Sequence, residues 1–397
     1  MAPPPTPSPK QSPSASAASN STSSLPPITL SSIAAAASSS SSSNVMNCLW
    51  IPLLIALSKE LTGSASANPT ASPLVLFNQA YPFTAVPRCP AANPNLNSQP
   101  VIGILSHPGD GASGRLSNAS DASYIAASYV KFVESAGARV IPLIFNEPKE
   151  VLNKLKCVDS ARMRITFALK GVSNKLNLVS GVIFTGGRVK SGPYFEVVKS
   201  IFKNVKTKND EGDHFPLLAI CLGFELVTMI VSEDENILEK FNAINQPSTL
   251  KFMKDVNING TVFQRFPPAL KKKLSTDFLV LQEHRYGISP KKFRKSQRLC
   301  SFFEILTTSA DRNGKAYVST MRARKYPVTA VQWHPEKNAF EWGLSMIPHS
   351  EDAVQVTQHV ANFIVREARM SKNRPSAREV LDNLIYNYSP TYCGKAG

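Results

Sequence analysis

The chain has 397 residues and a formal charge of +16, which comes from 44 Lys and Arg against 28 Asp and Glu. It contains neither an RNP signature nor zinc-finger spacing, so nucleic acid is not an expected partner. It also has no HExxH motif and no spaced Cys/His cluster, so neither a metal nor another cofactor is expected. The basic clusters are expected to form solvated faces or to attract an acidic substrate.

The N-terminal region has the composition of a leader rather than of a folded domain. Residues 1–45 are almost all Pro, Ser, Ala and Thr, which bury too little apolar surface to offset the entropy of ordering. An apolar run from Cys48 to Leu57 follows, and then Ala65-Ser66-Ala67. This run is about half the length of a membrane span, and the small residues suit signal peptidase. Residues 1–67 are therefore predicted to be a low-complexity leader plus a secretory signal peptide, with no membrane attachment after cleavage.

Secretory entry predicts a vacuolar or extracellular, cell-wall location and changes how other residues are interpreted. Asn118 and Asn259 each begin an Asn-x-Ser/Thr sequon, so they are candidate glycosylation sites. After Cys48 the chain has an odd number of cysteines, so at least one thiol has no partner within the chain. These cysteines are Cys89, Cys157, Cys221, Cys300 and Cys393.

A single domain is predicted for residues 100–372, after an irregular Pro- and Asn-rich segment at 68–99 and before a C-terminal tail at 373–397. Apolar periodicity within it predicts strands at 101–105, 139–144, 178–184, 215–220, 276–282, 317–321 and 328–333. It predicts helices at 124–136, 194–205 and 351–372. Strands that alternate with helices indicate an α/β fold with a mostly parallel sheet and helices on both faces. The stretch 156–173 has no clean period and is interpreted as an insertion in a surface loop.

Cys221 is the first candidate catalytic residue. It ends the apolar strand Phe215 to Ile220 and is followed at once by Leu-Gly-Phe-Glu, the pattern of a nucleophile elbow. Such a turn presents the sulfur at a helix N-terminus, where the positive end of the helix dipole favours the thiolate. Ala219 and Gly223 supply the small residues that a sharp turn needs.

A base for this thiol is offered by the strand that ends at Trp333-His334-Pro335-Glu336. His334 is the candidate base. Glu336 is placed to accept a hydrogen bond from the imidazole and to hold the tautomer that takes the thiol proton.

The strand at 178–184 ends near a glycine pair, Gly186-Gly187. Glycine allows a main-chain N–H to approach a reacting carbonyl without a Cβ in the way. The backbone N–H groups of Gly187 and Leu222 are therefore the predicted oxyanion hole.

The order of the glycine pair, the Cys221 elbow and the Trp-His-Pro-Glu strand end resembles the class I glutamine amidotransferase family. That resemblance implies a flavodoxin-like sheet and a triad of Cys221, His334 and Glu336. Within this group, the stretches 103–110 (GILSHPGD), 221–225 (CLGFE) and 332–342 (QWHPEKNAFEW) look like the γ-glutamyl hydrolases, most of all the plant type. The resemblance also implies that His284 is a second active-site histidine and that Gly186 and Glu225 contact the substrate.

The expected function is that of a thiol hydrolase, an omega peptidase that cleaves γ-glutamyl amide bonds of folate polyglutamates through a thioester on Cys221. The family resemblance also leads us to expect a homodimer. Two alternatives remain open on sequence alone: a glutaminase-type amidotransferase module and a catalytically inactive γ-glutamyl-binding protein. The absence of a GxxxxGK[ST] loop for a fused synthase weighs against the first, and the complete triad against the second.

Overall fold

A computed structural model describes residues 93, 95–109, 122–146 and 171–391 of the chain. Their main feature is an eight-stranded sheet in the order β4-β1-β5-β6-β12-β11-β10-β8. The five strands from β4 to β12 are parallel, and the remaining three extend the sheet in antiparallel fashion. The strands are β1 (Val101–Leu105), β4 (Arg139–Leu143), β5 (Gly181–Phe184), β6 (Leu217–Ile220), β8 (Lys251–Phe252), β10 (Phe303–Ala310), β11 (Ala316–Ala323) and β12 (Val328–Val331).

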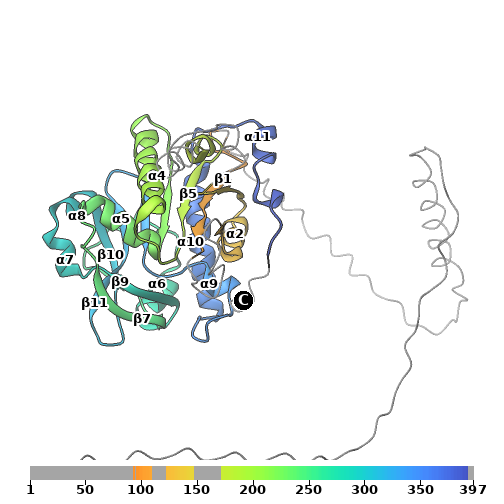
Figure 1. Ribbon diagram of the computed structural model, residues 1–397. Coiled ribbons are helices and arrows are strands. Elements are labelled where there is room, and N and C mark those ends of the chain that lie inside the picture. The colour runs from red at the N-terminus through yellow and green to blue at the C-terminus, as the bar shows by residue number, and fades with distance from the viewer. Residues whose placement is uncertain (1–92, 94, 110–121, 147–170, 392–397) are drawn as a thin grey trace, which may run out of the picture. The chain divides into compact units, whose positions relative to one another are not determined.

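Helices cover both faces of this sheet, as the alternating pattern predicts (Figure 1). Alternate residues of each parallel strand enter two separate cores, because successive side chains of a strand point to opposite faces. Ile102, Ile183 and Leu218 pack with α2 (Ala127–Glu134) and α10 (Glu351–Arg369). Val182 and Leu217 pack on the other face with α4 (Gly192–Asp210) and α5 (Leu222–Ser232). The mostly parallel, doubly covered fold is confirmed.

A separate two-stranded antiparallel ribbon pairs β7 (Glu239–Ser248) with β9 (Val280–Gly287). It lies near β11 and α6 at the lower edge of the view in Figure 1. The other short elements are β2 (His107–Pro108), β3 (Ser123–Tyr124), α6 (Pro268–Thr276), α7 (Pro290–Lys295), α8 (Gln297–Phe302), α9 (Lys337–Phe340), α11 (Ala377–Leu381) and η3 (Ile385–Asn387).

Some predicted boundaries differ from the observed ones. The strand expected at 276–282 begins only at Val280, because residues 268–276 complete the helix α6 that Pro268 opens. The helix expected at 124–136 begins at Ala127, since Ser123 and Tyr124 pair with the strand β2.

The segment after residue 372, expected to be a tail, is packed against the domain over its described part. Its side chains Val380 and Leu384 are buried in the core that contains α4 and α5. Ser376 and Glu379 form a capping box at the start of α11. The Asn373 amide donates hydrogen bonds to two carbonyls of the segment before β5. The folded domain therefore continues beyond the predicted boundary.

Several predictions fall outside the described residues. These are the leader at 1–67, most of the segment 68–99, the greater part of the insertion at 156–173, Asn118, and the cysteines at 89, 157 and 393. Among the helices that the structure describes, none has the length and apolarity needed to cross a bilayer.

Candidate active site

Cys221 lies between β6 and α5 in a backbone conformation that few residues adopt, with φ 52° and ψ −101°. This strained turn needs a residue without a side chain close to it, and Gly223 is that residue. A Cβ on Gly223 would lie 2.8 Å from the Phe184 Cβ and 2.9 Å from the Phe184 carbonyl oxygen. The absence of a side chain at Gly223 therefore lets α5 begin directly against β5, and the sulfur is presented at the helix N-terminus, as predicted.

Strand register brings the second candidate residue beside the first. β6 and β12 are parallel neighbours, with Ile220 opposite Val331, and the Cys221 N–H donates to the Val331 carbonyl at 2.8 Å. Because parallel strands end at the same edge of a sheet, the chain after β12 reaches this edge within three residues and places His334 there. The hydrogen bonds of the sheet therefore fix the two strand ends relative to each other.

His334, the candidate base, is held by a hydrogen bond to Glu336. The imidazole Nδ1 lies 2.7 Å from the Glu336 Oε1, and both side chains are buried. The Cys221 side chain is the other partner of the imidazole, by a hydrogen bond and by charge. Burial alone would lower the pKa of His334, but the Glu336 carboxylate and the Cys221 sulfur outweigh it and raise the pKa to about 10. The ring is therefore oriented with one nitrogen on the carboxylate and is strongly stabilised as the imidazolium.

The glycine turn lies directly against this pair. A Cβ on Gly186 would be 2.8 Å from the His334 Cε1 and 3.6 Å from the Cys221 Cβ. The N–H groups of Gly187 and Leu222 have no hydrogen-bond acceptor within the described ranges, and Leu222 is the first residue of α5, where no intrahelical acceptor exists. Both N–H groups lie just beyond the carboxyl ends of the adjacent strands β5 and β6, and Gly187 lines the same cavity as Cys221.

His284 reaches the same site from β9. Its Nδ1–H donates to the Tyr286 carbonyl at 2.9 Å, and its ring packs edge-on against Tyr317 with centroids 4.6 Å apart. Burial lowers the pKa of His284 to about 3, and the nearby His334 acts in the same direction. The ring is therefore neutral, with its Nε2 unprotonated and able to accept a hydrogen bond.

The strand β9, together with the residue before it, is attached to the cavity residues by carbonyls at every second position. The Leu279 carbonyl accepts from the Asn338 amide at 3.0 Å, the Leu281 carbonyl from the His334 N–H at 3.0 Å, and the Glu283 carbonyl from the Cys221 thiol at 3.6 Å. Because residues two apart in a strand face the same way, one edge of β9 contacts all three. This attachment fixes the strand that carries His284 at the cavity that Cys221 also lines.

A cavity of about 560 Å³ opens above these groups. Its walls carry four cationic side chains, namely Arg188, Lys190, Arg285 and Lys337. Arg188 and Arg285 are exposed and make no ion pair with any described residue. Three glutamates, Glu225, Glu283 and Glu341, also line the cavity, so Arg188 and Arg285 are the cationic side chains there that no described carboxylate neutralises.

Glu225 lines the cavity but is not free to act alone. Its Oε2 lies 2.9 Å from the Lys190 Nζ, which also lies 4.4 Å from the centre of the Tyr286 ring. Burial raises the pKa of Glu225 to about 7, although Lys190 opposes the shift. Glu225, which the family resemblance implies as a substrate contact, therefore lines the cavity as one member of a Glu–Lys pair. The partner lysine carries no motif that reveals it in the sequence.

A second acidic residue at the cavity, Glu341, was also not predicted. It accepts a hydrogen bond from the Ser128 hydroxyl at 2.5 Å and pairs with Lys337. Burial alone would raise the pKa of Glu341, but Lys337 and Ser128 together lower it. The stretch Lys337 to Glu341 has i, i+4 spacing, which is the one sequence signal that indicates this ion pair.

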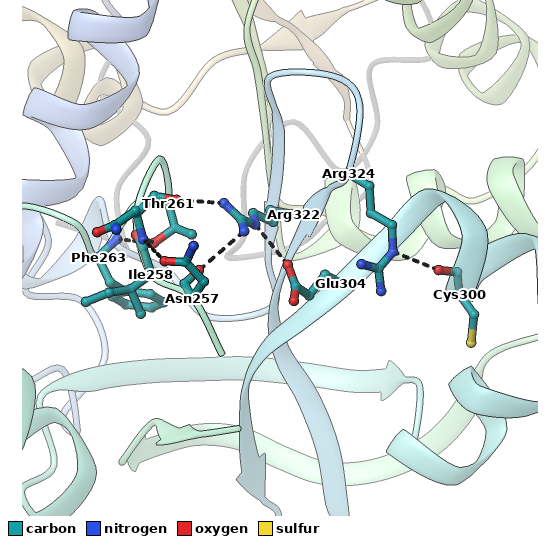
Figure 2. Close-up of polar contacts among 9 residues, drawn as sticks. Asn257, Ile258, Thr261, Phe263, Cys300, Glu304, Arg322 and Arg324 are labelled. Atoms are coloured by element: carbon teal, nitrogen blue, oxygen red, sulfur yellow. Dashed lines mark hydrogen bonds and ion pairs between the residues drawn. The ribbon is translucent and has the colours of Figure 1, made fainter. Parts of the chain in front are cut away.

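Asn259, the candidate glycosylation site within the described residues, is exposed and does not line the cavity. Figure 2 shows Arg322 between Glu304 and the loop that begins at Asn257. The Arg322 guanidinium donates to the carbonyls of Asn257 and Asn259, and the Thr261 hydroxyl donates to the Ile258 carbonyl. The sequon therefore lies in a well-held exposed turn, and its glycosylation stays a prediction.

The structure thus brings together Cys221, His334, Glu336, His284, Gly186, Gly187, Leu222 and Glu225. Cys300, the other described cysteine, is half-buried and, like Cys221, forms no disulfide. In the part of the chain that the structure describes, no group of three or more His, Cys, Asp or Glu residues is arranged to hold a metal ion.

A flavodoxin-like sheet with a Cys–His–Glu arrangement at its carboxyl edge defines the class I glutamine amidotransferases, and residues 152–351 match the family described as Glutamine amidotransferase class-I. Within this class the chain belongs to the γ-glutamyl hydrolase family. It is 58% identical to "Gamma-glutamyl hydrolase 2" of Arabidopsis thaliana over 350 residues, covering 88% of this chain and 94% of the relative. "Gamma-glutamyl hydrolase 1" of the same plant is 54% identical over 351 residues, with coverages of 88% and 94%.

Among solved structures, the chain is similar to a glutamine amidotransferase from Thermotoga maritima. The matched region is 68% of this chain and 98% of that chain, with 12% identity and a TM-score of 0.35. The family assignment therefore depends on the sequence comparisons alone.

Proposed function

We propose that the protein hydrolyses γ-glutamyl amide bonds with Cys221 as nucleophile. Below the raised pKa of His334, its Nε2 already holds the proton of the Cys221 thiol before the substrate binds, and the sulfur attacks the γ-carbonyl carbon of the substrate as the thiolate. The carbonyl oxygen becomes an oxyanion, which the N–H groups of Gly187 and Leu222 stabilise. Glu336 stabilises the imidazolium. The observation that carries the proposal is the Glu336–His334 hydrogen bond directed at a cysteine in a strained elbow.

The imidazolium then donates its proton to the nitrogen of the leaving amine, and the C–N bond breaks. A γ-glutamyl thioester on Cys221 results. Water, deprotonated by His334, attacks this thioester; the C–S bond breaks, the glutamyl product is released, and the sulfur leaves as the thiolate while His334 keeps the proton. Neutral His284 supplies an unpartnered hydrogen-bond acceptor in the cavity that Cys221 also lines. We assign to it the orientation of the scissile amide N–H.

The substrates that we propose are folate polyglutamates, whose tails carry one carboxylate per residue. Arg188 and Arg285 offer guanidinium groups without another described partner at the opening of the cavity, and a guanidinium binds a carboxylate through two parallel hydrogen bonds. The Lys190–Glu225 pair deeper in the cavity presents both signs of charge, which suits the amino and carboxylate groups of a terminal glutamate.

The direct test is to incubate the purified protein with a folyl polyglutamate and to follow the products by mass spectrometry. Cys221→Ser is expected to remain folded and to lose turnover by at least about 10⁴-fold, because a serine hydroxyl is far harder to deprotonate than a thiol. Cys300→Ser is the matched control, since it changes the other described free thiol and should keep full activity. An active Cys221→Ser variant would overturn the mechanism.

We also propose a secretory route to the vacuole or cell wall, a homodimer, and glycans on Asn118 or Asn259. The support is the apolar run at 48–57 with its small-residue cleavage site, the exposed turn at Asn259 and, for the dimer, the family resemblance. N-terminal sequencing of mature plant-expressed protein is expected to start near residue 68. A mature N-terminus at Met1 would refute the route. Light scattering after size exclusion tests the dimer.

A further inference from the structure

The conformation of the Gly186-Gly187 turn has to be fixed by contacts with other residues, because glycine itself restricts the backbone least of all residues. Gly187 has a φ of 153°, and a Cβ there would lie 2.2 Å from the His107 Nε2. The His107 ring therefore packs directly against the Gly187 Cα. His107 is itself held, since its Nδ1–H donates to the Pro108 carbonyl at 2.7 Å and its ring packs edge-on against Tyr194.

The other end of the turn is held by Tyr129, a residue of α2. The Gly186 N–H donates to the Tyr129 hydroxyl oxygen at 2.8 Å. The same hydroxyl lies 2.9 Å from the position that a Gly186 Cβ would occupy, next to the His334 Cε1. Tyr129 thus reaches the middle of the active site from the helix that packs on β1 and α10.

The hydroxyl stays protonated in this position. Burial raises the pKa of Tyr129 well above its ordinary value, and the nearby Glu336 and Cys221 add to the shift. The neutral phenol oxygen accepts the hydrogen bond from the Gly186 N–H. Because the hydroxyl is uncharged, it does not form an ion pair that would move it away from Gly186. No other acceptor for this N–H exists among the described residues.

We propose that Tyr129 is a positioning residue that aims the Gly187 N–H at the reacting carbonyl. The peptide before Gly186 is anchored by the Tyr129 hydroxyl, and the residue after it is anchored by the His107 ring. The peptide between them, which contains the Gly187 N–H, therefore has a single orientation. This inference rests on the proposed function, because it assumes that the Gly187 N–H stabilises an oxyanion.

Tyr129→Phe removes the hydroxyl and keeps the ring, so the Gly186 N–H loses its acceptor and the turn gains freedom. Loss of one complete oxyanion donor costs about 10² to 10³ in kcat, and a donor that is only misaligned part of the time should cost less. We expect kcat to fall about 10- to 100-fold, with KM within about twofold of wild type.

Two probes separate this role from a general loss of structure. A γ-glutamyl aldehyde adds the Cys221 sulfur to its carbonyl and forms a hemithioacetal whose oxygen occupies the oxyanion site, whereas alkylation by iodoacetamide needs the thiolate alone. Tyr129→Phe should weaken aldehyde binding by the same factor as kcat and leave the alkylation rate unchanged. Phe132→Leu, at a buried position one turn further along α2, is the matched control and should lower the melting temperature without changing aldehyde affinity.

Wild-type kcat and aldehyde affinity in Tyr129→Phe would overturn the proposal. A parallel loss of alkylation would also overturn it, since Tyr129 would then act on the thiol. The proposed substrate is tested separately: a wild-type protein that binds the aldehyde but leaves folyl polyglutamates intact would refute that substrate and not the tyrosine.

Discussion

Two buried histidines face the same cavity from different parts of the molecule, and their charge states differ: His334 favours the imidazolium, and His284 is neutral. His334 follows a strand of the parallel sheet, and His284 lies in the β7–β9 ribbon; each is only 4% exposed. Glu336 and Cys221 raise the pKa of the first to about 10, whereas burial lowers the pKa of the second to about 3.

The difference shows that burial alone does not decide the state of a histidine. His284 donates its Nδ1–H to a neutral carbonyl, and His334 donates to a carboxylate. The negative charge of that single partner outweighs the desolvation that both rings experience. One ring is therefore suited to carry a proton and the other to remain an uncharged acceptor.

His334→Ala is the variant expected to have the largest effect, because it removes the histidine that carries the proton. Without the imidazole, the Cys221 thiol has no proton acceptor and the leaving amine has no donor. We expect kcat to fall by about 10³- to 10⁴-fold with KM little changed. Steady-state kinetics on a folyl polyglutamate measures this. A fully active His334→Ala with an inactive His284→Ala would mean that the base is the other histidine.

His284→Ala should cost less, because it removes an uncharged acceptor and leaves the proton carrier in place. We expect a loss of about 10²-fold in kcat, with an unchanged shape of the pH profile, since a group with a pKa of about 3 does not titrate in the neutral and alkaline range. His359→Ala is the control, because His359 lies in helix α10 and does not line the cavity. Wild-type activity in His284→Ala would show that this ring has no catalytic part.

Glu336→Gln is expected to have the smallest effect on kcat, about tenfold, since the dyad of Cys221 and His334 persists. Its sharper effect is on pH. The imidazolium of His334 is present below its pKa and is lost as the pH rises through it, at about 10 in the wild type. The carboxylate of Glu336 raises the pKa of His334 and burial lowers it, so removal of the carboxylate lowers this pKa. The alkaline fall in kcat/KM should therefore begin at a lower pH, and an unmoved alkaline limb would refute this assignment to Glu336.

The parts of this site that lie on strand ends could be predicted from sequence. The elbow at Cys221 and the Trp-His-Pro-Glu turn each follow a short apolar run, and parallel strands necessarily end at one edge. The order of these local patterns was therefore enough to predict that Cys221, His334 and the glycine pair lie close together.

Tyr129 and Lys190 could not be predicted in the same way. Tyr129 belongs to an ordinary amphipathic helix, and only the packing of α2 on the sheet turns its hydroxyl toward Gly186. The ribbon strand β7 was missed because its sequence, EKFNAINQPS, is polar and contains a proline, which lowers the strand signal. Its pairing with β9 depends on tertiary contacts that no local period records.

The backbone at Cys221 has a consequence for engineering. A non-glycine residue with φ 52° and ψ −101° carries a local strain of about 1 to 3 kcal/mol, which the surrounding sheet and helix have to absorb. Glycine would occupy this position with less strain, so a redesign guided only by folding free energy would replace the proposed nucleophile first. The elbow is thus a place where the chain gives up thermodynamic stability to keep a reactive atom, and any thermostabilised variant has to be designed around it.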